Sequence, residues 1–187
     1  MNIKTKHRNE ILFFAGIAKR INVSPNYISA ISILLCAIAG YFVLQNLLAY
    51  AAIFWLLSGL FDSLDGLIAK MHNRSTKFGS LFDKVADRIN DAIILCAIIL
   101  AGLVELWIGL AALVLITIAS YASACLDAQV EKTAGEKLSL RAVRTGIIFI
   151  GLLLGMKISV QYAVYIVLII GAYALASRLI YAKKVLG

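Results

Sequence analysis

The sequence is poor in charged residues and in proline. Only 15% of its 187 residues are charged, and proline occurs once, at residue 25. Hydrophobic residues make up 62% and the mean hydropathy is +0.92, whereas soluble domains are usually about 45–50% apolar. This composition excludes an ordinary soluble domain and predicts an integral membrane protein. Since there is no Pro-rich or low-complexity linker, we expect one membrane domain over residues 1–187.

Cysteine and histidine are also scarce, with three and two residues. Cys36, Cys96 and Cys125 each lie inside an apolar run, at spacings that suit neither a disulfide framework nor a zinc site. We therefore expect them to be small core residues. The N-terminus is polar and basic, and its first apolar segment leads straight into the rest of the chain, which predicts that there is no cleavable signal peptide.

Long apolar runs recur along the whole sequence. Each has about 20 residues, enough to cross a bilayer as a helix, so we predict an all-α fold with six transmembrane helices. Ser24, just before Pro25 and Asn26, is the expected N-cap of the first helix. The predicted turns are residues 45–46, 102–105 and 157–161. The predicted spans form a six-helix bundle over residues 26–182 and are 26–44, 48–71, 78–101, 107–126, 141–156 and 162–180.

Basic residues gather on one side of this predicted bundle. With six spans, 17 of the 18 Lys and Arg residues fall on the side that holds the N-terminus, and only Lys157 falls opposite. The positive-inside rule then places both termini at the cytoplasmic face of the cell membrane. Residues 1–25 are basic, amphipathic and too short to span, so we expect an interfacial helix there. The net charge of +8 suits anionic lipids and phosphorylated substrates, and we expect no nucleic-acid partner.

Half of the ten acidic residues occur between residues 62 and 91. Asp62 and Asp65 lie near the end of the second predicted span, and Asp83 and Asp87 near the start of the third, which is the same cytoplasmic side. A charged side chain at membrane depth costs about 3 kcal/mol or more, so it usually faces a polar cavity and marks a functional site. Because of the three- and four-residue spacings, each pair projects from one helix face. Four carboxylates therefore converge if the two helices pack together.

We expect two divalent cations to neutralise these carboxylates. Oxygen ligands favour magnesium, manganese or calcium, and the absence of a nearby His or Cys argues against zinc. Small residues and basic residues near the predicted metal site would make room for a phosphate ester and bind it, which favours phosphoryl transfer. The small residues are Gly66, Ala69 and Gly79, and the cations are Lys70, Arg74 and Lys77.

Two other interpretations of the acidic residues remain open. They could line the cation pathway of a transporter, or they could form ion pairs with Lys84 and Arg88 that serve structure alone. Asp91 lies one turn deeper than Asp87, where it could hydrogen-bond a substrate or pair with Arg88. Composition and spacing favour metal-dependent chemistry over both alternatives.

The order of aspartates and glycines from Asp62 to Asp87 resembles a family signature. The CDP-alcohol phosphotransferase family carries Asp-x-x-Asp-Gly-x-x-Ala-Arg, a spacer, and then Gly-x-x-x-Asp-x-x-x-Asp. The sequence has every aspartate and glycine of this signature and departs from it only at Lys70, where arginine is usual. Lysine can neutralise a phosphate but lacks the bidentate fork of arginine. The resemblance implies a six-span, homodimeric enzyme of phospholipid synthesis that transfers a phosphate-linked alcohol from a CDP-linked donor to an acceptor hydroxyl and releases CMP.

The resemblance also implies roles for individual residues. Asp62, Asp65 and Asp83 would hold one metal ion, and Asp62, Asp83 and Asp87 a second, either Mg²⁺ or Mn²⁺. Asp87 would be the general base. The donor would be a lipid such as CDP-diacylglycerol or CDP-archaeol. The residues implied for the CDP site are Asn26, Ser29, Asp62, Gly66, Ala69, Lys70, Thr76 and Gly79.

Inositol phosphate is the acceptor that the sequence favours. The Asp-Arg-x-x-Asp sequence from Asp87 to Asp91 resembles the branch of the family that uses this acceptor. Arg141 and Arg144, one turn apart near the start of the fifth span, are similar to the paired arginines with which that branch holds the acceptor phosphate. Lys77 and Lys137 could assist them. The positive-inside rule alone also explains basic residues at these positions.

One departure keeps other substrates open. The inositol-phosphate branch tends to carry arginine after Tyr121, whereas the sequence there reads ASACLDAQ. The absence of this phosphate ligand leaves serine, glycerol phosphate or a CDP-inositol donor as alternatives.

Overall fold

A computed structural model describes residues 24–71, 76–129 and 140–186, with the exception of the side chains of residues 25, 65–67 and 69–71. Within these ranges every regular element is an α-helix, as predicted. The predicted interfacial helix of residues 1–25 falls almost entirely outside them. The helices are α2 (Pro25–Leu44), α3 (Leu48–Met71), α4 (Lys77–Leu100), α5 (Leu106–Gln129), α6 (Leu140–Leu153) and α7 (Lys157–Leu186).

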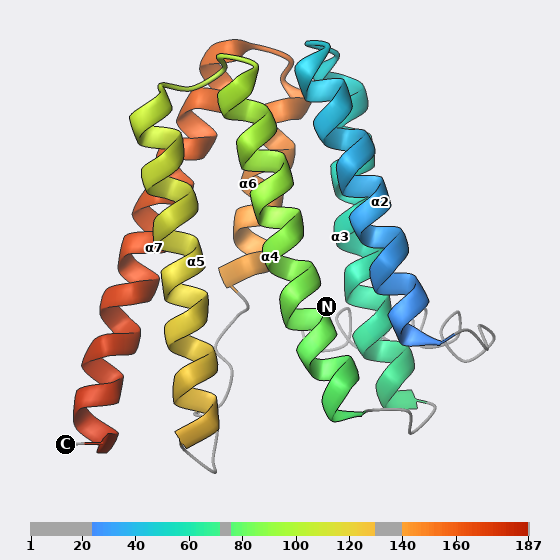
Figure 1. Cartoon of the computed structure of the whole chain (residues 1–187). Helices are drawn as coiled ribbons and strands as arrows, with labels where there is room; N and C mark the ends of the chain where they lie inside the picture. The colour runs from blue at the N-terminus through green and yellow to red at the C-terminus, as the bar shows by residue number, and fades with distance from the viewer. Residues whose placement is uncertain (1–23, 72–75, 130–139, 187) are drawn as a thin grey trace, which may run out of the picture.

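The helices run side by side and alternate in direction (Figure 1). Helix α2 packs against α3 and α4, α5 packs against α7, and the short helix α6 packs against α3 and α7. In Figure 1 the α2–α3 and α5–α7 pairs form two sides of the molecule, and α4 and α6 lie between them. Helix α3 ends and α4 begins at the lower end of the molecule in this view. The acidic residues between Asp62 and Asp91 lie in this part of the chain.

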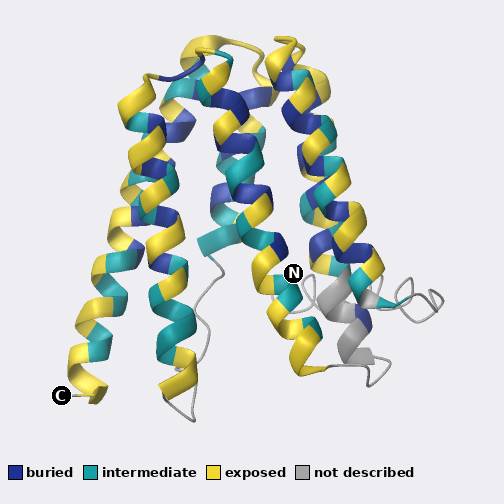
Figure 2. Cartoon of the chain, viewed as in Figure 1, coloured by how far each residue is buried: buried dark blue, intermediate teal, exposed yellow. Residues whose placement is uncertain are grey.

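Buried residues gather in the upper half of the bundle in this view (Figure 2). Alanine and branched aliphatic side chains, such as Ala51, Leu95, Ile98, Leu152 and Val164, form one continuous core across all six helices. Toward the lower half the residues become intermediate or exposed. The apolar core thus holds the helices together above the acidic residues and leaves the polar end open.

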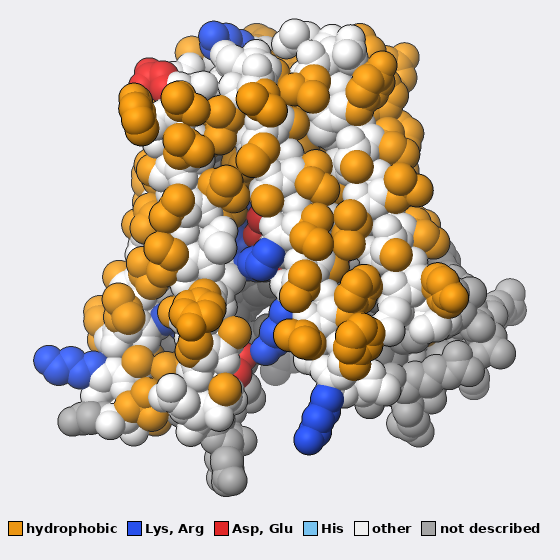
Figure 3. Space-filling model, in the orientation of Figure 1, with side chains coloured by type: hydrophobic (Ala, Val, Ile, Leu, Met, Phe, Trp, Pro, Cys, Tyr) orange, Lys and Arg blue, Asp and Glu red, His pale blue; other side chains and the backbone are white. Residues whose placement is uncertain are grey.

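Apolar side chains also cover the outside of the bundle (Figure 3). Leu100, Trp107 and Ile169 are more than two-thirds exposed, at 76%, 78% and 67%. Among the described residues, three helical segments are long and apolar enough to cross a membrane, Asn26–Leu44, Leu106–Gln129 and Lys157–Leu186, and Leu48–Leu64 is a shorter apolar one. An apolar outer surface of this extent belongs in lipid, so the chain is a membrane protein.

A buried polar cluster joins α2, α3 and α4 immediately above the acidic residues. The Asn90 side-chain amide on α4 donates to Ser32 Oγ on α2 at 3.0 Å, and Ser58 Oγ on α3 donates to the Ser32 carbonyl at 2.8 Å. Cys36 Sγ lies 3.4 Å from the Asn90 carbonyl. Because hydrogen bonds between membrane helices have directional geometry, this cluster fixes how α4 sits against its two neighbours.

The predicted boundaries of α2, α3 and α4 hold to within one residue. Helix α5 ends at Gln129, three residues beyond the predicted end, and α6 ends at Leu153, three residues short of it. Helix α7 begins at Lys157, so the turn predicted at residues 157–161 is wrong. The chain turns at Gly155 instead, where φ is +66°, a conformation that glycine adopts without a steric penalty. Helix α7 also continues beyond the predicted end, to Leu186.

Two smaller predictions also need correction. Ser24 is the N-cap residue of α2, but its side chain makes no capping hydrogen bond. Cys36 is buried as expected, whereas Cys96 is exposed and Cys125 is only partly covered, so they are not core residues. An apolar run predicts membrane burial, but it does not tell a core face from a lipid face.

Close packing of α6 against α7 depends on Gly151. A Cβ atom at this position would lie 2.6 Å from Ala163 Cβ and 3.2 Å from the Ser159 carbonyl oxygen, and neither atom can rotate away. We expect Gly151→Ala to destabilise the purified protein by about 1–3 kcal/mol, which a lower thermal unfolding midpoint in detergent would reveal.

Gly146→Ala on the same helix is the matched control. Among the described residues, and apart from the chain neighbours and the helix's own backbone, no atom lies within 4 Å of a Cβ at residue 146. Alanine also favours the helix, so this variant is expected to unfold at the same temperature or higher. Equal midpoints for the two variants would contradict the packing argument.

Candidate metal and phosphate site

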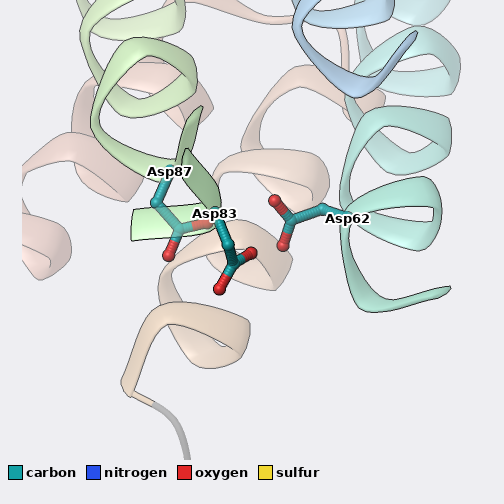
Figure 4. Close-up of side chains that lie close together, drawn as sticks. All are labelled: Asp62, Asp83 and Asp87. Atoms are coloured by element: carbon teal, nitrogen blue, oxygen red, sulfur yellow. The ribbon is translucent and has the colours of Figure 1, made fainter. Parts of the chain in front are cut away.

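Three carboxylates from two helices converge at the open end of the bundle (Figure 4). Asp62 projects from α3, and Asp83 and Asp87 project from α4 toward it. One oxygen from each lies within 4.8 Å of the other two. The four-residue spacing on α4 puts its two carboxylates on the same face, as the sequence predicted. We refer to Asp62, Asp83 and Asp87 as the carboxylate cluster.

The carboxylate cluster fits a divalent cation. Asp62 is only 8% exposed, and its Oδ1 atom is buried without a hydrogen-bond partner among the described residues. A buried, unpaired carboxylate oxygen is costly, by about 1–3 kcal/mol or more, unless a cation or donor meets it. Several oxygen ligands with no described nitrogen or sulfur ligand among them match the preferences of magnesium and manganese. Asp65 was predicted to belong to this cluster, but its side chain lies outside the described residues.

Arg141 links α6 to this cluster. Its Nη1 atom forms ion pairs with Asp62 Oδ2 and Asp87 Oδ1, so one guanidinium reaches carboxylates on both α3 and α4. From the family resemblance, Arg141 was predicted to bind the acceptor phosphate. The structure puts it beside the predicted metal ligands, a contact between residues 79 positions apart that no local pattern could have indicated.

A second charged group lies next to the cluster. Arg144 is 6% exposed, and its Nη2 atom lies 3.4 Å from Asp91 Oδ2. Arg88 Nη2 lies 3.4 Å from Asp87 Oδ2 and 3.6 Å from Asp91 Oδ2, and its Nη1 atom donates to Ser120 Oγ on α5. Asp91 therefore pairs with Arg88, as one of the two interpretations held, and with Arg144 as well. The contact with Ser120 was missed, because a serine in an apolar run gives little signal.

Lys84 takes no part in these contacts. Its Nζ atom lies 3.6 Å from Asp127 Oδ2 on α5, and both side chains are largely exposed. The suggestion that Lys84 neutralises the carboxylate cluster is therefore not supported.

Figure 3 shows the open end of the bundle as a hollow in which basic and acidic side chains face each other, between flanks of apolar ones.

The start of α4 brings together three residues that the sequence assigned to CDP. Thr76 is the N-cap of α4, and its hydroxyl accepts a hydrogen bond from the Gly79 backbone N–H at 2.9 Å. A Cβ atom at Gly79 would lie 3.1 Å from Thr76 Oγ1 and 3.5 Å from Asn26 Oδ1, so α2 and α4 approach closely here. Ser29 is buried one turn further along α2. The side chains of Gly66, Ala69 and Lys70 lie outside the described residues, as does Lys137, while Lys77 is exposed.

Comparison with known proteins identifies the family. The sequence model of the family described as CDP-alcohol phosphatidyltransferase matches residues 22–184. The chain belongs to this family. It is therefore a transferase of the membrane, as the signature residues predicted, and the transporter interpretation is set aside.

Two archaeal relatives match over most of their length. An archaetidylinositol phosphate synthase of Pyrococcus horikoshii is 32% identical over 165 residues, which cover 88% of this chain and 86% of the relative. The protein of the same name from Methanothermobacter thermautotrophicus is 32% identical over 174 residues, covering 90% and 88%.

The fold is also that of a solved enzyme. The phosphatidylinositol phosphate synthase of Mycobacterium tuberculosis with CDP-DAG bound superimposes with a TM-score of 0.75 at 20% identity, covering 89% of this chain and 91% of that one. The same enzyme in complex with manganese and citrate also gives a TM-score of 0.75, covering 89% and 87%. The manganese bound in this solved structure and the carboxylate cluster, in which Asp62 is buried and Asp83 and Asp87 are partly buried, both agree with the use of a divalent metal.

If the carboxylate cluster holds a cation, Asp83→Asn should weaken Mn²⁺ binding. Loss of one charged ligand is expected to raise the dissociation constant by at least about tenfold, because even outer-shell partners are worth about 10–100-fold. Titration of the purified protein with Mn²⁺, followed by electron paramagnetic resonance of the free ion, measures this constant.

Asp127→Asn is the matched control, since Asp127 is an exposed carboxylate that pairs with Lys84 and lies outside the cluster. It should bind Mn²⁺ as the wild type does. Equal weakening in both variants would mean that overall charge, and not the cluster, governs binding.

Proposed function

We propose that the protein transfers a phosphatidyl or archaetidyl group from a CDP-linked lipid to a hydroxyl of inositol phosphate and releases CMP. The observation that carries this proposal is the likeness to archaetidylinositol phosphate synthases over nearly the whole of both chains. The carboxylate cluster, with the partly buried Arg141 and the buried Arg144 beside it, supports the same reaction, since both the pyrophosphate and the acceptor carry phosphate.

The carboxylates bind and activate the reactants. Asp62, Asp65, Asp83 and Asp87 are proposed to hold two divalent cations, Mg²⁺ or Mn²⁺, which when bound supply charge neutralisation for the pyrophosphate. Asp87 accepts the proton of the acceptor hydroxyl. The hydroxyl oxygen forms a bond to the lipid-linked phosphorus as the bond between that phosphorus and the bridging oxygen breaks, and CMP leaves with this oxygen. The contact between Arg88 and Asp87 Oδ2 orients the carboxylate for this step.

The remaining residues position the two substrates. Asn26, Thr76 and Gly79 meet where α2 approaches α4, and together with Ser29, Gly66, Ala69 and Lys70 they are proposed to line the CDP site. Arg141 and Arg144 lie in the first two turns of α6, where the helix dipole adds to their positive charge. We propose that they bind the acceptor phosphate with help from Lys77 and Lys137.

The membrane arrangement follows from the distribution of charge. We propose that all six helices are membrane-embedded within one domain, that both termini and the site face the cytoplasm, and that the enzyme is a homodimer. Basic residues on the side of the N-terminus support this orientation.

Release of CMP tests the proposed reaction. Purified protein with CDP-archaeol or CDP-diacylglycerol and Mn²⁺ should release CMP when inositol phosphate is added, and not when inositol, serine or glycerol phosphate replaces it. Release with glycerol phosphate alone would overturn the proposed acceptor, and release with none of the four would overturn the reaction.

Arg144→Ala tests the acceptor site. Loss of a charged hydrogen bond to a phosphate costs about 1.5–3 kcal/mol, so the Michaelis constant for inositol phosphate should rise at least about tenfold, while that for the CDP-lipid stays the same. Lys183→Ala, which removes an exposed cation near the end of α7, is the control and should leave both constants unchanged. Unchanged acceptor constants for Arg144→Ala would favour a role in membrane topology alone.

A further inference from the structure

Arg141 shares one ion-pair partner, Asp87, with Arg88, and differs from the other two arginines of the site in pairing with two members of the carboxylate cluster. Arg88 is held on three sides, by Asp87 and Asp91 on its own helix and by Ser120 on α5. Arg144 pairs with Asp91, which is outside the carboxylate cluster. The ion-pair partners of Arg141 among the described residues are Asp62 and Asp87, two members of that cluster. Its Nε atom is buried without a hydrogen-bond partner there, as are the Nε atoms of Arg88 and Arg144.

At this position the guanidinium of Arg141 would repel a divalent cation bound to the same carboxylates. A divalent cation bound by the carboxylate cluster and the guanidinium of Arg141 would share the same carboxylates, and like charges at such short range repel strongly in a partly buried site. Arginine cannot relieve the conflict by losing its proton. The guanidinium must therefore either weaken cation binding or move away from the carboxylates.

An anion at the mouth of the site gives the guanidinium an alternative partner. A phosphate accepts paired hydrogen bonds from arginine at least as well as a carboxylate does. The side chain of Arg141 has several rotatable bonds, and its unpaired Nε atom shows that its present contacts leave one donor unused.

We propose that Arg141 competes with the divalent cation for the carboxylate cluster, and that binding of the acceptor phosphate relieves this competition by drawing the guanidinium away. Because coupling between two sites is reciprocal, the acceptor phosphate then tightens cation binding and the cation tightens acceptor binding. The inference rests on the proposed function for the presence of the cation and of an acceptor that carries phosphate. It makes Arg141 a coupling residue in addition to a phosphate ligand.

The direction in which Arg141→Gln changes the affinity for Mn²⁺ tests the competition. Arg141→Gln should bind Mn²⁺ about tenfold or more tightly than the wild type, with no nucleotide or acceptor present, because a repelling charge has been removed. Free Mn²⁺ is followed by electron paramagnetic resonance in the detergent-purified protein. Unchanged or weaker binding overturns the proposal, since it would mean that Arg141 does not oppose the cation or that it organises the carboxylates for it.

Arg144→Gln is the matched control, with the same change of charge one turn along the same helix. Arg144 contacts Asp91 and not the cluster, so its loss should change Mn²⁺ affinity by less than about threefold, as expected for a more distant and partly screened charge. An equal gain in both variants overturns the specific role of Arg141. Arg141→Lys keeps the charge and, if the glutamine variant does not fold, should bind Mn²⁺ as weakly as the wild type.

Inositol phosphate tests the coupling. Its addition should tighten Mn²⁺ binding by the wild type several-fold and have no such effect on Arg141→Gln. Inorganic phosphate should act in the same direction, whereas free inositol should not. Equal tightening in wild type and variant overturns the coupling. Since CMP release tests the reaction separately, a protein that releases CMP normally but shows no gain of Mn²⁺ affinity in Arg141→Gln contradicts this inference alone.

Discussion

Carboxylates placed between apolar helices require positive charge close by, and this requirement organises the lower half of the bundle. Asp62 reaches in from α3 and Asp87 from α4, and Arg141 of α6 meets both of them. Arg144, one turn further along α6, adds an ion pair with Asp91 of α4. These ion pairs tie α6 to α3 and α4, two helices from which it is distant in sequence.

The charged groups depend in turn on the apolar half above them. Small and branched side chains pack α2, α3 and α4 closely, and the hydrogen bonds among Asn90, Ser32 and Ser58 set the relative positions of these helices. Asn90 is three residues from Asp87. A shift of α4 that broke these hydrogen bonds would therefore also move the carboxylates of α4 away from Asp62. The packing of the apolar half therefore sets the geometry of the charged half.

Most of the fold and the central part of the site could be predicted from the sequence. The lengths of the apolar runs gave the helices, and helical spacing alone was enough to pair Asp83 with Asp87. What could not be predicted depends on contacts between distant segments. The pairing of Arg141 with Asp62 and the contact between Arg88 and Ser120 follow from how the helices pack, which periodicity does not encode. The last turn was predicted at residues 157–161, whereas the chain reverses at Gly155, just before α7 begins at Lys157.

Within α6, Arg141 precedes Leu153 by 153 − 141 = 12 residues, which at about 1.5 Å per residue is about 18 Å, whereas the hydrocarbon layer of a bilayer is roughly 30 Å thick. If Leu153 lies near one surface of the membrane, Arg141 lies below the level of the other surface. In the proposed reaction, a polar reactant from the aqueous phase would then descend several ångströms to meet this arginine, while a lipid reactant already lies at that depth. The depth of Arg141 would thus let a water-soluble and a lipid-soluble reactant meet at one level, and neither would have to leave its own solvent completely.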